Sequence, residues 1–191
     1  MFDHLFKPIS VNGMILKNRI IATPTGDDFE EKAMGGGAAL VIAGHAIVEP
    51  GRSSFASPEE PYPFAKYERE ETRKKVLKIH RGGGAKASVE IFHAGQDART
   101  VDYAKGPSAL IRPDGVEVKE MDEEMMEETL RWYAETAASA KKIGFDSIFL
   151  HFGHGWLPAQ FLSPHYNHRT DIYGGGVLKT EVVSHFGFWR Q

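Results

Sequence analysis

Two histidines three positions apart, His151 and His154, are the side chains of this sequence best suited to chemistry. They stand at and just beyond the end of an apolar run, 147–151, and a helix-compatible segment over 157–162 follows them. Imidazole groups titrate near neutral pH and can hydrogen-bond a carbonyl or anionic oxygen. Together with His93 they could instead ligate zinc, although no carboxylate stands at an evident ligand spacing. A structural role at the strand end is the third interpretation.

Three glycine triplets, beginning at Gly35, Gly82 and Gly174, raise the question of a phosphate-binding loop. Such a loop follows a strand and opens a helix. The first two triplets instead follow helix-compatible segments and precede apolar strands, so they indicate helix ends. The third lies in a polar loop and supports no assignment.

The composition narrows the classes of function. The chain has 191 residues, of which 41% are hydrophobic, with 23 basic and 26 acidic side chains. This balance disfavours a nucleic-acid surface, and no run approaches the roughly 18 apolar residues of a membrane span. Because the sequence lacks cysteine, disulfides, thiolate metal sites and cysteine nucleophiles are excluded. The N-terminus lacks the layout of a secretory signal, so we expect a soluble, cytoplasmic protein.

The hydrophobic pattern predicts the order of the elements. Two short runs, 9–11 and 14–16, flank Asn12-Gly13, the pair that most readily takes positive φ at both turn positions, and they predict a β-hairpin. Four further strands are expected at 18–23, 38–43, 86–92 and 147–151. Helices are expected at 27–34, 65–80 and 122–143, with loops at 58–63 and 93–113.

Two of the expected helices have a recognisable core face. In the second helix the residues expected toward the core are Val76, Leu77 and His80. In the third helix, steps of four and three place one apolar stripe on one face: Met126, Leu130, Tyr133, Ala137 and Ala140. Gly144 follows at the position of a left-handed C-terminal cap.

Strands and helices alternate along the chain, and this alternation implies an α/β fold with a parallel sheet. The loops after strands are long and the turns before them are short. That asymmetry matches a barrel whose active site lies at the carboxyl ends of its strands. A doubly wound open sheet has the same alternation, so periodicity alone leaves both architectures open.

Four segments, in order, resemble one enzyme family. They read LFKPISVNGMILKNRIIATPTG, GGGAALVIAGHAIVEPGR, ASVEIFHAGQDAR and HFGHGWLPAQFLSPHYNHRTDIYGG. They are similar to the old yellow enzyme, or NADH:flavin oxidoreductase, family, and most of all to its enoate reductase, bile-acid and dienoyl-CoA reductase branch. The resemblance implies the N-terminal half of a (β/α)8 TIM barrel, about four βα units with an N-terminal β-hairpin. We expect this partial domain to span 1–176, followed by a divergent tail over 177–191.

The resemblance also implies an FMN site at the ends of the first three strands. The residues that would contact the flavin are Thr23, Pro24, Thr25, Gly44, His45 and Glu90. Glu90 stands where many members have a glutamine against the pyrimidine edge of the flavin. A carboxylate can accept a hydrogen bond from the flavin N3–H but donates one only when protonated, so this exchange would alter the tuning of the flavin.

The implied chemistry is hydride transfer in two successive half-reactions. NAD(P)H reduces FMN, and the flavin then passes hydride to the β-carbon of an α,β-unsaturated carbonyl substrate. His151 and His154 match the paired residues that anchor the carbonyl oxygen. Trp156 stands where many members have a proton-donating tyrosine, which an indole cannot replace at neutral pH. Arg169 and Asp171 match a motif that we interpret as a structural ion pair.

One expectation about assembly and two alternative functions stand beside this hypothesis. A half barrel leaves strand edges unpaired and apolar surface uncovered, so we expect self-association into a homo-oligomer or a need for a complementary barrel half. Because a complete barrel takes about 250 residues, the chain is expected to be truncated, and it could be an inactive fragment or an assembly partner. The less favoured alternative is a metal-dependent hydrolase that uses His93, His151 and His154.

Overall fold

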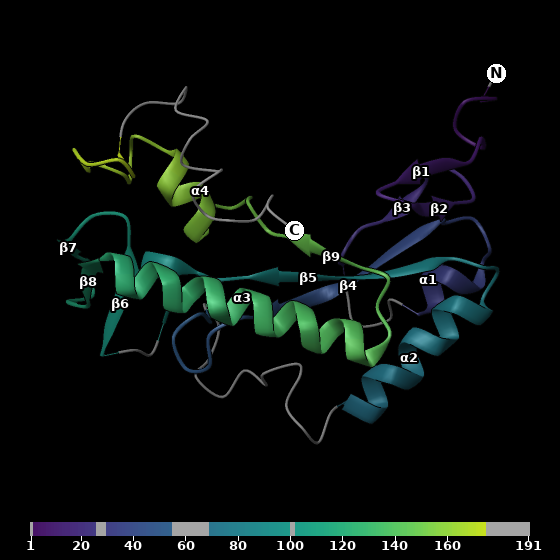
Figure 1. Ribbon diagram of the computed structural model, residues 1–191, viewed down its shortest axis with the longest axis horizontal. Helices are drawn as coiled ribbons and strands as arrows, with labels where there is room; N and C mark the ends of the chain where they lie inside the picture. The colour runs from purple at the N-terminus through teal and green to yellow at the C-terminus, as the bar shows by residue number, and fades with distance from the viewer. Residues whose placement is uncertain (1, 26–29, 55–68, 100–101, 175–191) are drawn as a thin grey trace. The chain divides into compact units, whose positions relative to one another are not determined.

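The computed structural model describes residues 2–25, 30–54, 69–99 and 102–174 (Figure 1). The chain forms two compact units. Unit 1 comprises Met1–Ala46, Pro63–Ile91 and Thr136–Leu150, and unit 2 comprises Ile47–Tyr62, Phe92–Glu135 and His151–Gln191. The expected loop at 58–63 and the expected tail at 177–191 lie outside the described residues.

Unit 1 begins with the predicted hairpin. Strands β1 (Ile9–Val11) and β2 (Met14–Leu16) pair antiparallel. Asn12 and Gly13 both have positive φ, 46° and 81°, as the turn requires. The Asn-Gly prediction is therefore confirmed.

The main sheet of unit 1 has four strands in the order β3-β4-β5-β9. They are β3 (Ile21–Ala22), β4 (Leu40–Ile47), β5 (Lys86–Phe92) and β9 (Ser147–Leu150). β3 runs parallel to β4, and β5 runs parallel to β9. The predicted parallel sheet is confirmed. β3 is shorter than the strand expected at 18–23, and β4 extends four residues beyond the end of the strand expected at 38–43.

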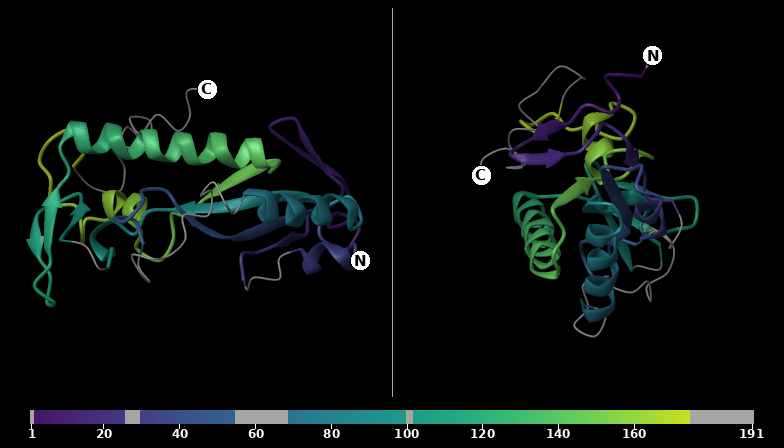
Figure 2. Two further views of the ribbon diagram at one scale, coloured as in Figure 1. Left: turned by 90° about the horizontal axis from the view of Figure 1, so that it is seen from below. Right: turned by 90° about the vertical axis from the view of Figure 1, so that its right-hand side faces the viewer.

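Helices α1 (Glu31–Met34) and α2 (Arg69–Arg81) belong to unit 1, and α3 (Glu123–Ile143) contributes its C-terminal part. Figure 2 shows α2 and this part of α3 on the same side of the strands. Val76 is buried as expected, but the prediction for Leu77 is wrong, because its side chain is 40% exposed. Ile79, three residues after Val76, is buried in its place. The glycine triplet that follows α2 has positive φ at its last two residues, which fits a helix end.

Helix α3 follows its predicted register closely. Every member of the apolar stripe is buried or half-buried: Met126, Leu130, Tyr133, Ala137 and Ala140. Gly144 ends the helix with φ of 116°, as the expected cap requires. Glu123 and Glu124 occupy the first turn, where the positive end of the helix dipole favours acidic side chains.

Unit 2 corrects one prediction. The segment expected to be a loop contains the 3-10 helix η1 (Gly95–Asp97) and the strands β6 (Tyr103–Gly106) and β7 (Leu110–Ile111). Together with β8 (Glu117–Glu120) these strands form a small sheet in the order β6-β8-β7. Helix α4 (Leu157–Leu162) lies where a helical segment was expected.

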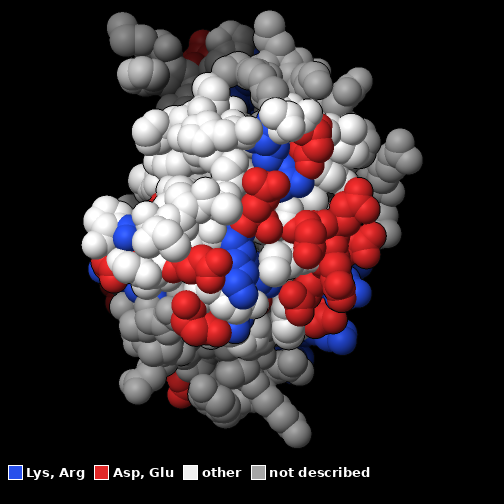
Figure 3. Space-filling model, turned by 90° about the vertical axis from the view of Figure 1, so that its left-hand side faces the viewer, with Lys and Arg blue, Asp and Glu red and all other residues white. Residues whose placement is uncertain are grey.

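The surface of the molecule carries mixed charge on the face seen in Figure 3, where acidic side chains gather beside a line of basic ones. Within the described residues, no helix has the length and apolar character of a membrane span.

Candidate active site

The two predicted histidines of unit 2 lie in contact. His151 is half-buried and His154 is exposed on the loop that leads from β9 to α4. Their rings meet edge to face, with centroids 4.8 Å apart, and Nδ1 of His154 lies 2.9 Å from Nε2 of His151. The sequence prediction that these imidazoles act together is therefore compatible with their placement.

Hydrogen bonds determine the tautomers of this pair. The backbone N–H of Gly153 donates to Nδ1 of His151 at 3.1 Å, so this nitrogen carries no proton. A neutral His151 then carries its proton on Nε2 and donates it to Nδ1 of His154. His154 in turn carries its own proton on Nε2. The N–H that the pair does not use internally is therefore His154 Nε2–H.

The backbone of this loop is unusual at two consecutive residues. His154 has φ of 55° and Gly155 has φ of 75°. A Cβ at Gly155 would also stand 3.3 Å from the hydroxyl of Tyr166. Positive φ at a non-glycine residue is uncommon and costs energy, so the surroundings must hold His154 in this conformation.

Trp156 forms a wall behind the two imidazoles. Its ring lies 5.6 Å from Phe92, 6.2 Å from His151 and 6.4 Å from His154, measured between centroids. It packs against a buried cluster that includes Phe92 and Val118. These contacts place Trp156 beside both imidazoles and against the buried cluster.

Gln160 connects the loop between β9 and α4, which carries His151 and His154 and is called the histidine loop below, to the segment after β5. Its side chain is fully buried, and its Nε2 donates to the carbonyls of Gly155 at 2.7 Å and Ala94 at 3.0 Å. Its Oε1 accepts from the backbone N–H of Gln96 at 3.0 Å. Gly95 has φ of 63°, and a Cβ there would collide with the Gln160 amide. A side chain at position 95 is therefore incompatible with Gln160 in this conformation.

A buried charged group lies beside this connection. Lys105 on β6 is 3% exposed, and its ammonium lies 2.9 Å from Oε1 of Glu49 and 3.2 Å from Oε2 of Glu128. The other Glu49 oxygen accepts from Nε2 of His93 at 3.0 Å, while Nδ1 of His93 accepts from the Gly95 N–H at 2.9 Å. Both ring nitrogens of His93 are thus engaged in hydrogen bonds.

Opposing effects act on the Glu49 carboxyl. Burial by itself would raise the pKa of Glu49, but the hydrogen bond from His93 and the Lys105 ammonium outweigh burial and lower this pKa below its usual value. Glu49 is therefore ionised and paired with Lys105.

The metal alternative finds little support in this geometry. Neither ring nitrogen of His93 is available to a metal ion. Within the ranges that the structure describes, no three His, Asp or Glu side chains form a cluster that could hold one.

The residues predicted to contact a cofactor lie in unit 1. Thr23 and Thr25 follow β3 and are exposed. Lys32 holds this segment: its ammonium donates to the carbonyls of Thr23 and Thr25 and to the Thr25 hydroxyl. Lys32 was not predicted, because nothing in the sequence relates a helical lysine to a loop seven residues earlier. Pro24 between the threonines is half-buried.

The other three predicted cofactor residues lie on neighbouring strands. Gly44 is half-buried and His45 is exposed, although the residues on both sides of this pair in β4 are buried. Ala22, the last residue of β3, pairs with Val41 of β4, so Thr23 to Thr25 and Gly44 all come after this pair along the chain. Glu90 on β5 is 8% exposed and pairs with Phe149 of β9.

Arg169 and Asp171 form the expected ion pair, with Nε of Arg169 3.0 Å from both carboxylate oxygens. The guanidinium also donates to the carbonyls of Met121 at 2.8 Å and Pro107 at 3.2 Å. These contacts fasten the loop after α4 to the ends of β6 and β8, which is a structural role.

Comparison with known proteins finds relatives among the NADPH dehydrogenases. The chain is 32% identical to an NADPH dehydrogenase of Halalkalibacterium halodurans over 96% of its length, and 30% identical to one of Bacillus subtilis over 92%. It covers 60% and 56% of those two proteins, so it spans somewhat over half the length of these relatives.

Solved structures show the same fold. Histamine dehydrogenase from Rhizobium sp. 4-9 matches 97% of the chain with a TM-score of 0.81 and 25% identity, and the match covers 31% of that protein. Old Yellow Enzyme from Pichia sp. AKU4542 matches 96% with a TM-score of 0.77 and 28% identity, over 54% of its own length. The predicted TIM-barrel architecture, present here in part, is confirmed. The model of the NADH:flavin oxidoreductase / NADH oxidase family matches residues 4–180, and the chain belongs to this family.

Proposed function

We propose that this chain supplies the flavin-contacting and substrate-anchoring part of an FMN-dependent NAD(P)H oxidoreductase. The reaction is reduction of an α,β-unsaturated carbonyl compound. The observation that carries the proposal is the His151–His154 pair, which presents one N–H donor just after the end of β9. Because the curated relatives are NADPH dehydrogenases, NADPH is the favoured reductant.

The residues of unit 1 fit a flavin chemically. Thr23 and Thr25 offer backbone groups and hydroxyls, and His45 offers an exposed imidazole beside Gly44. Glu90 supplies an acceptor suited to an imide N–H such as N3 of a flavin. When bound, the flavin would take hydride from the nicotinamide and deliver it to the substrate.

In the proposed reaction His154 binds the carbonyl oxygen of the substrate through Nε2–H. This donor stabilises the negative charge that grows on the oxygen as hydride reaches the β-carbon. His151 is a positioning residue in this scheme, because its Nε2–H holds the His154 ring and fixes the tautomer. The resemblance implies two donors to the substrate, whereas the reaction proposed here uses one.

The proton for the α-carbon comes from solvent in this proposal. Trp156 cannot supply it, and burial raises the pKa of the Tyr133 phenol above its usual range despite a backbone hydrogen bond at His93 that opposes the shift. His154 is exposed, so water reaches the substrate side of the loop.

The test is flavin binding followed by turnover. The purified 191-residue chain is titrated with FMN and followed by flavin absorbance and fluorescence quenching, and then assayed for NADPH oxidation with an enone. His154→Ala is expected to lower kcat by about 10²-fold, the usual effect of losing one oxyanion donor. His165→Ala, which removes an exposed imidazole of the same unit, is the control and should change little.

A second candidate is a catalytically inactive fragment that acts as an assembly partner. It is favoured by the coverage of the relatives, of which 40% or more of the length has no counterpart in this chain. The missing part of a TIM barrel includes the usual phosphate site after strands 7 and 8. Absence of flavin uptake at high FMN concentration would decide for this candidate.

A further inference from the structure

His154 and Gly155 are the central residues of a tight turn in the histidine loop. The Trp156 N–H donates to the carbonyl of Gly153 at 3.1 Å, and both residues between them have positive φ. Turns with positive φ at both central residues are dominated by glycine, asparagine and aspartate. The Asn12-Gly13 turn meets this preference, whereas the histidine turn has an imidazole at its first central position. Contacts from outside the turn must therefore hold it.

Gln160 supplies such a contact from the interior of unit 2. Its side chain is fully buried, and its Nε2 donates to the Gly155 carbonyl at 2.7 Å. The same nitrogen donates to the Ala94 carbonyl at 3.0 Å, and Oε1 accepts from the Gln96 N–H at 3.0 Å. The carboxamide is thus fixed at both ends, and it holds the Gly155 carbonyl toward the interior.

The conformation of the turn determines whether the two imidazoles meet. With φ of 55° at His154, its Nδ1 lies 2.9 Å from Nε2 of His151. A change to the ordinary negative φ would rotate the chain about the N–Cα bond by roughly 100° or more. Such a rotation would carry the His154 ring away from its partner.

We propose that Gln160 is a positioning residue for the substrate-anchoring histidine. Its hydrogen bond to the Gly155 carbonyl keeps the turn in its left-handed conformation, and the turn keeps Nδ1 of His154 on the His151 donor. The Nε2–H of His154 is then the group available to a carbonyl oxygen. The role in catalysis rests on the proposed function, whereas the effect on the geometry of the rings does not.

Contact between the two rings is the first measurement, made by NMR on the 191-residue chain with labelled histidine. Gln160→Met keeps the approximate length of the side chain and removes its hydrogen bonds. Loss of a buried hydrogen bond shifts such an equilibrium at least about fivefold, so the nuclear Overhauser effect between the rings should fall by about that factor. An unchanged signal would overturn the proposal.

A second variant isolates the donor. Gln160→Glu keeps the length of the side chain and an acceptor for the Gln96 N–H, but an ionised carboxylate has no proton to donate to Gly155. It should separate the rings as Gln160→Met does, and rings that stay together in this variant would contradict the proposal. Circular dichroism verifies that each variant folds, and Gln160→Glu decides the question if Gln160→Met does not.

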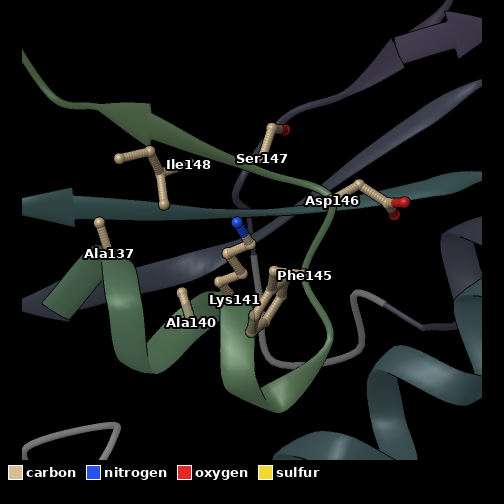
Figure 4. Close-up of a pocket in the computed structure, with 7 residues that line it drawn as sticks. All are labelled: Ala137, Ala140, Lys141, Phe145, Asp146, Ser147 and Ile148. Carbon is tan, nitrogen blue, oxygen red and sulfur yellow. The ribbon is translucent and has the colours of Figure 1, made fainter. Parts of the chain in front are cut away.

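Two control variants separate positioning from general loss of stability. Asn167→Leu removes another buried carboxamide of unit 2, which donates to the carbonyls of Phe161 at 2.8 Å and Tyr173 at 2.7 Å. Phe145→Leu shortens a buried side chain at an open cavity of about 290 Å³ between α3 and β9 (Figure 4). Both should leave the rings in contact. Separation of the rings in either control would mean that they report overall stability, and would refute the role of Gln160.

A double-mutant cycle tests the strain in the turn. Glycine adopts positive φ without steric cost, so His154→Gly relieves the turn only where the turn is held in that conformation. The change should therefore be more favourable to stability in the chain that retains Gln160 than in Gln160→Met, as measured by urea unfolding. Equal effects in the two backgrounds would show that the two positions are uncoupled.

Turnover distinguishes this proposal from the proposed function. If the chain reduces an enone, Gln160→Met should lower kcat toward the value of His154→Ala, while Asn167→Leu should not. If the chain shows no turnover, the proposed function fails for this chain, and the NMR and unfolding measurements still decide the role of Gln160.

Discussion

Replacement of Lys105 by methionine tests the buried charged group of unit 2. The Lys105 side chain is 3% exposed and that of Glu49 is 7% exposed. Methionine has a similar length but no charge, so Glu49 would keep the His93 hydrogen bond and lose its countercharge. Removing one partner of a buried ion pair costs about 3–5 kcal/mol. We expect the free energy of unfolding to fall by this amount. The loss is large, because the whole stability of a domain is typically roughly 5–15 kcal/mol.

The assay is urea unfolding followed by circular dichroism, with the denaturant slope verified as unchanged. Lys119→Met is the matched control: Lys119 pairs with Lys105 across the β6–β8 ladder, but its ammonium lies 3.7 Å over the Tyr103 ring. A cation at such a site contributes about 1 kcal/mol. The double variant Glu49→Gln/Lys105→Met should recover most of the loss, because a neutral amide can still accept from His93. If Lys105→Met costs no more than Lys119→Met, the reasoning is wrong.

Three further predictions concern other contacts. Gln160→Leu should lower the free energy of unfolding by about 2–4 kcal/mol, measured by urea unfolding, because buried backbone groups at Gly155 and Ala94 lose their partner. Gly95→Ala should destabilise the chain and raise the amide hydrogen exchange of the histidine loop, since a Cβ collides with the Gln160 amide. The hydrogen bonds to Asp146 lower its pKa although burial would raise it. The stability that Asp146 contributes is therefore present above its unfolded pKa and lost as the pH falls through the folded value. Asp146→Asn should flatten the acid side of the stability profile, and an unchanged profile would contradict this assignment.

Part of the fold could be predicted because its signals are local. The Asn12-Gly13 turn depends on the backbone freedom of two residues, and the α3 stripe depends on spacing along one helix. The failure at Leu77 shows the limit of such patterns. An apolar residue next to the core face of a helix is assigned correctly only when its neighbours in space are known.

The small sheet of unit 2 could not be predicted for a physical reason. Its strands are short, Leu110 and Ile111 on β7 are exposed, and the buried face of β6 includes a lysine. The charge of Lys105 is tolerated because Glu49 lies 56 residues earlier in the sequence and close in space. No periodicity in the sequence reveals such a pair.

The candidate site was predicted in part. The sequence places two histidines near the end of a strand, and the structure brings both imidazoles into contact. Their tautomers and the unequal roles that follow depend on the Gly153 N–H, which only the backbone conformation brings to His151.

The Gln160 connection also affects the timing of motion in unit 2. Its amide joins Gly155 in one loop to Ala94 in another, and the Leu157 N–H donates to the carbonyl of His93 beside it. Neither loop can open without breaking these shared hydrogen bonds. Local opening in proteins proceeds through such cooperative groups of residues. We therefore expect the two loops to open together. Any rearrangement of the histidine pair that requires loop opening can then be no faster than the breaking of these shared hydrogen bonds.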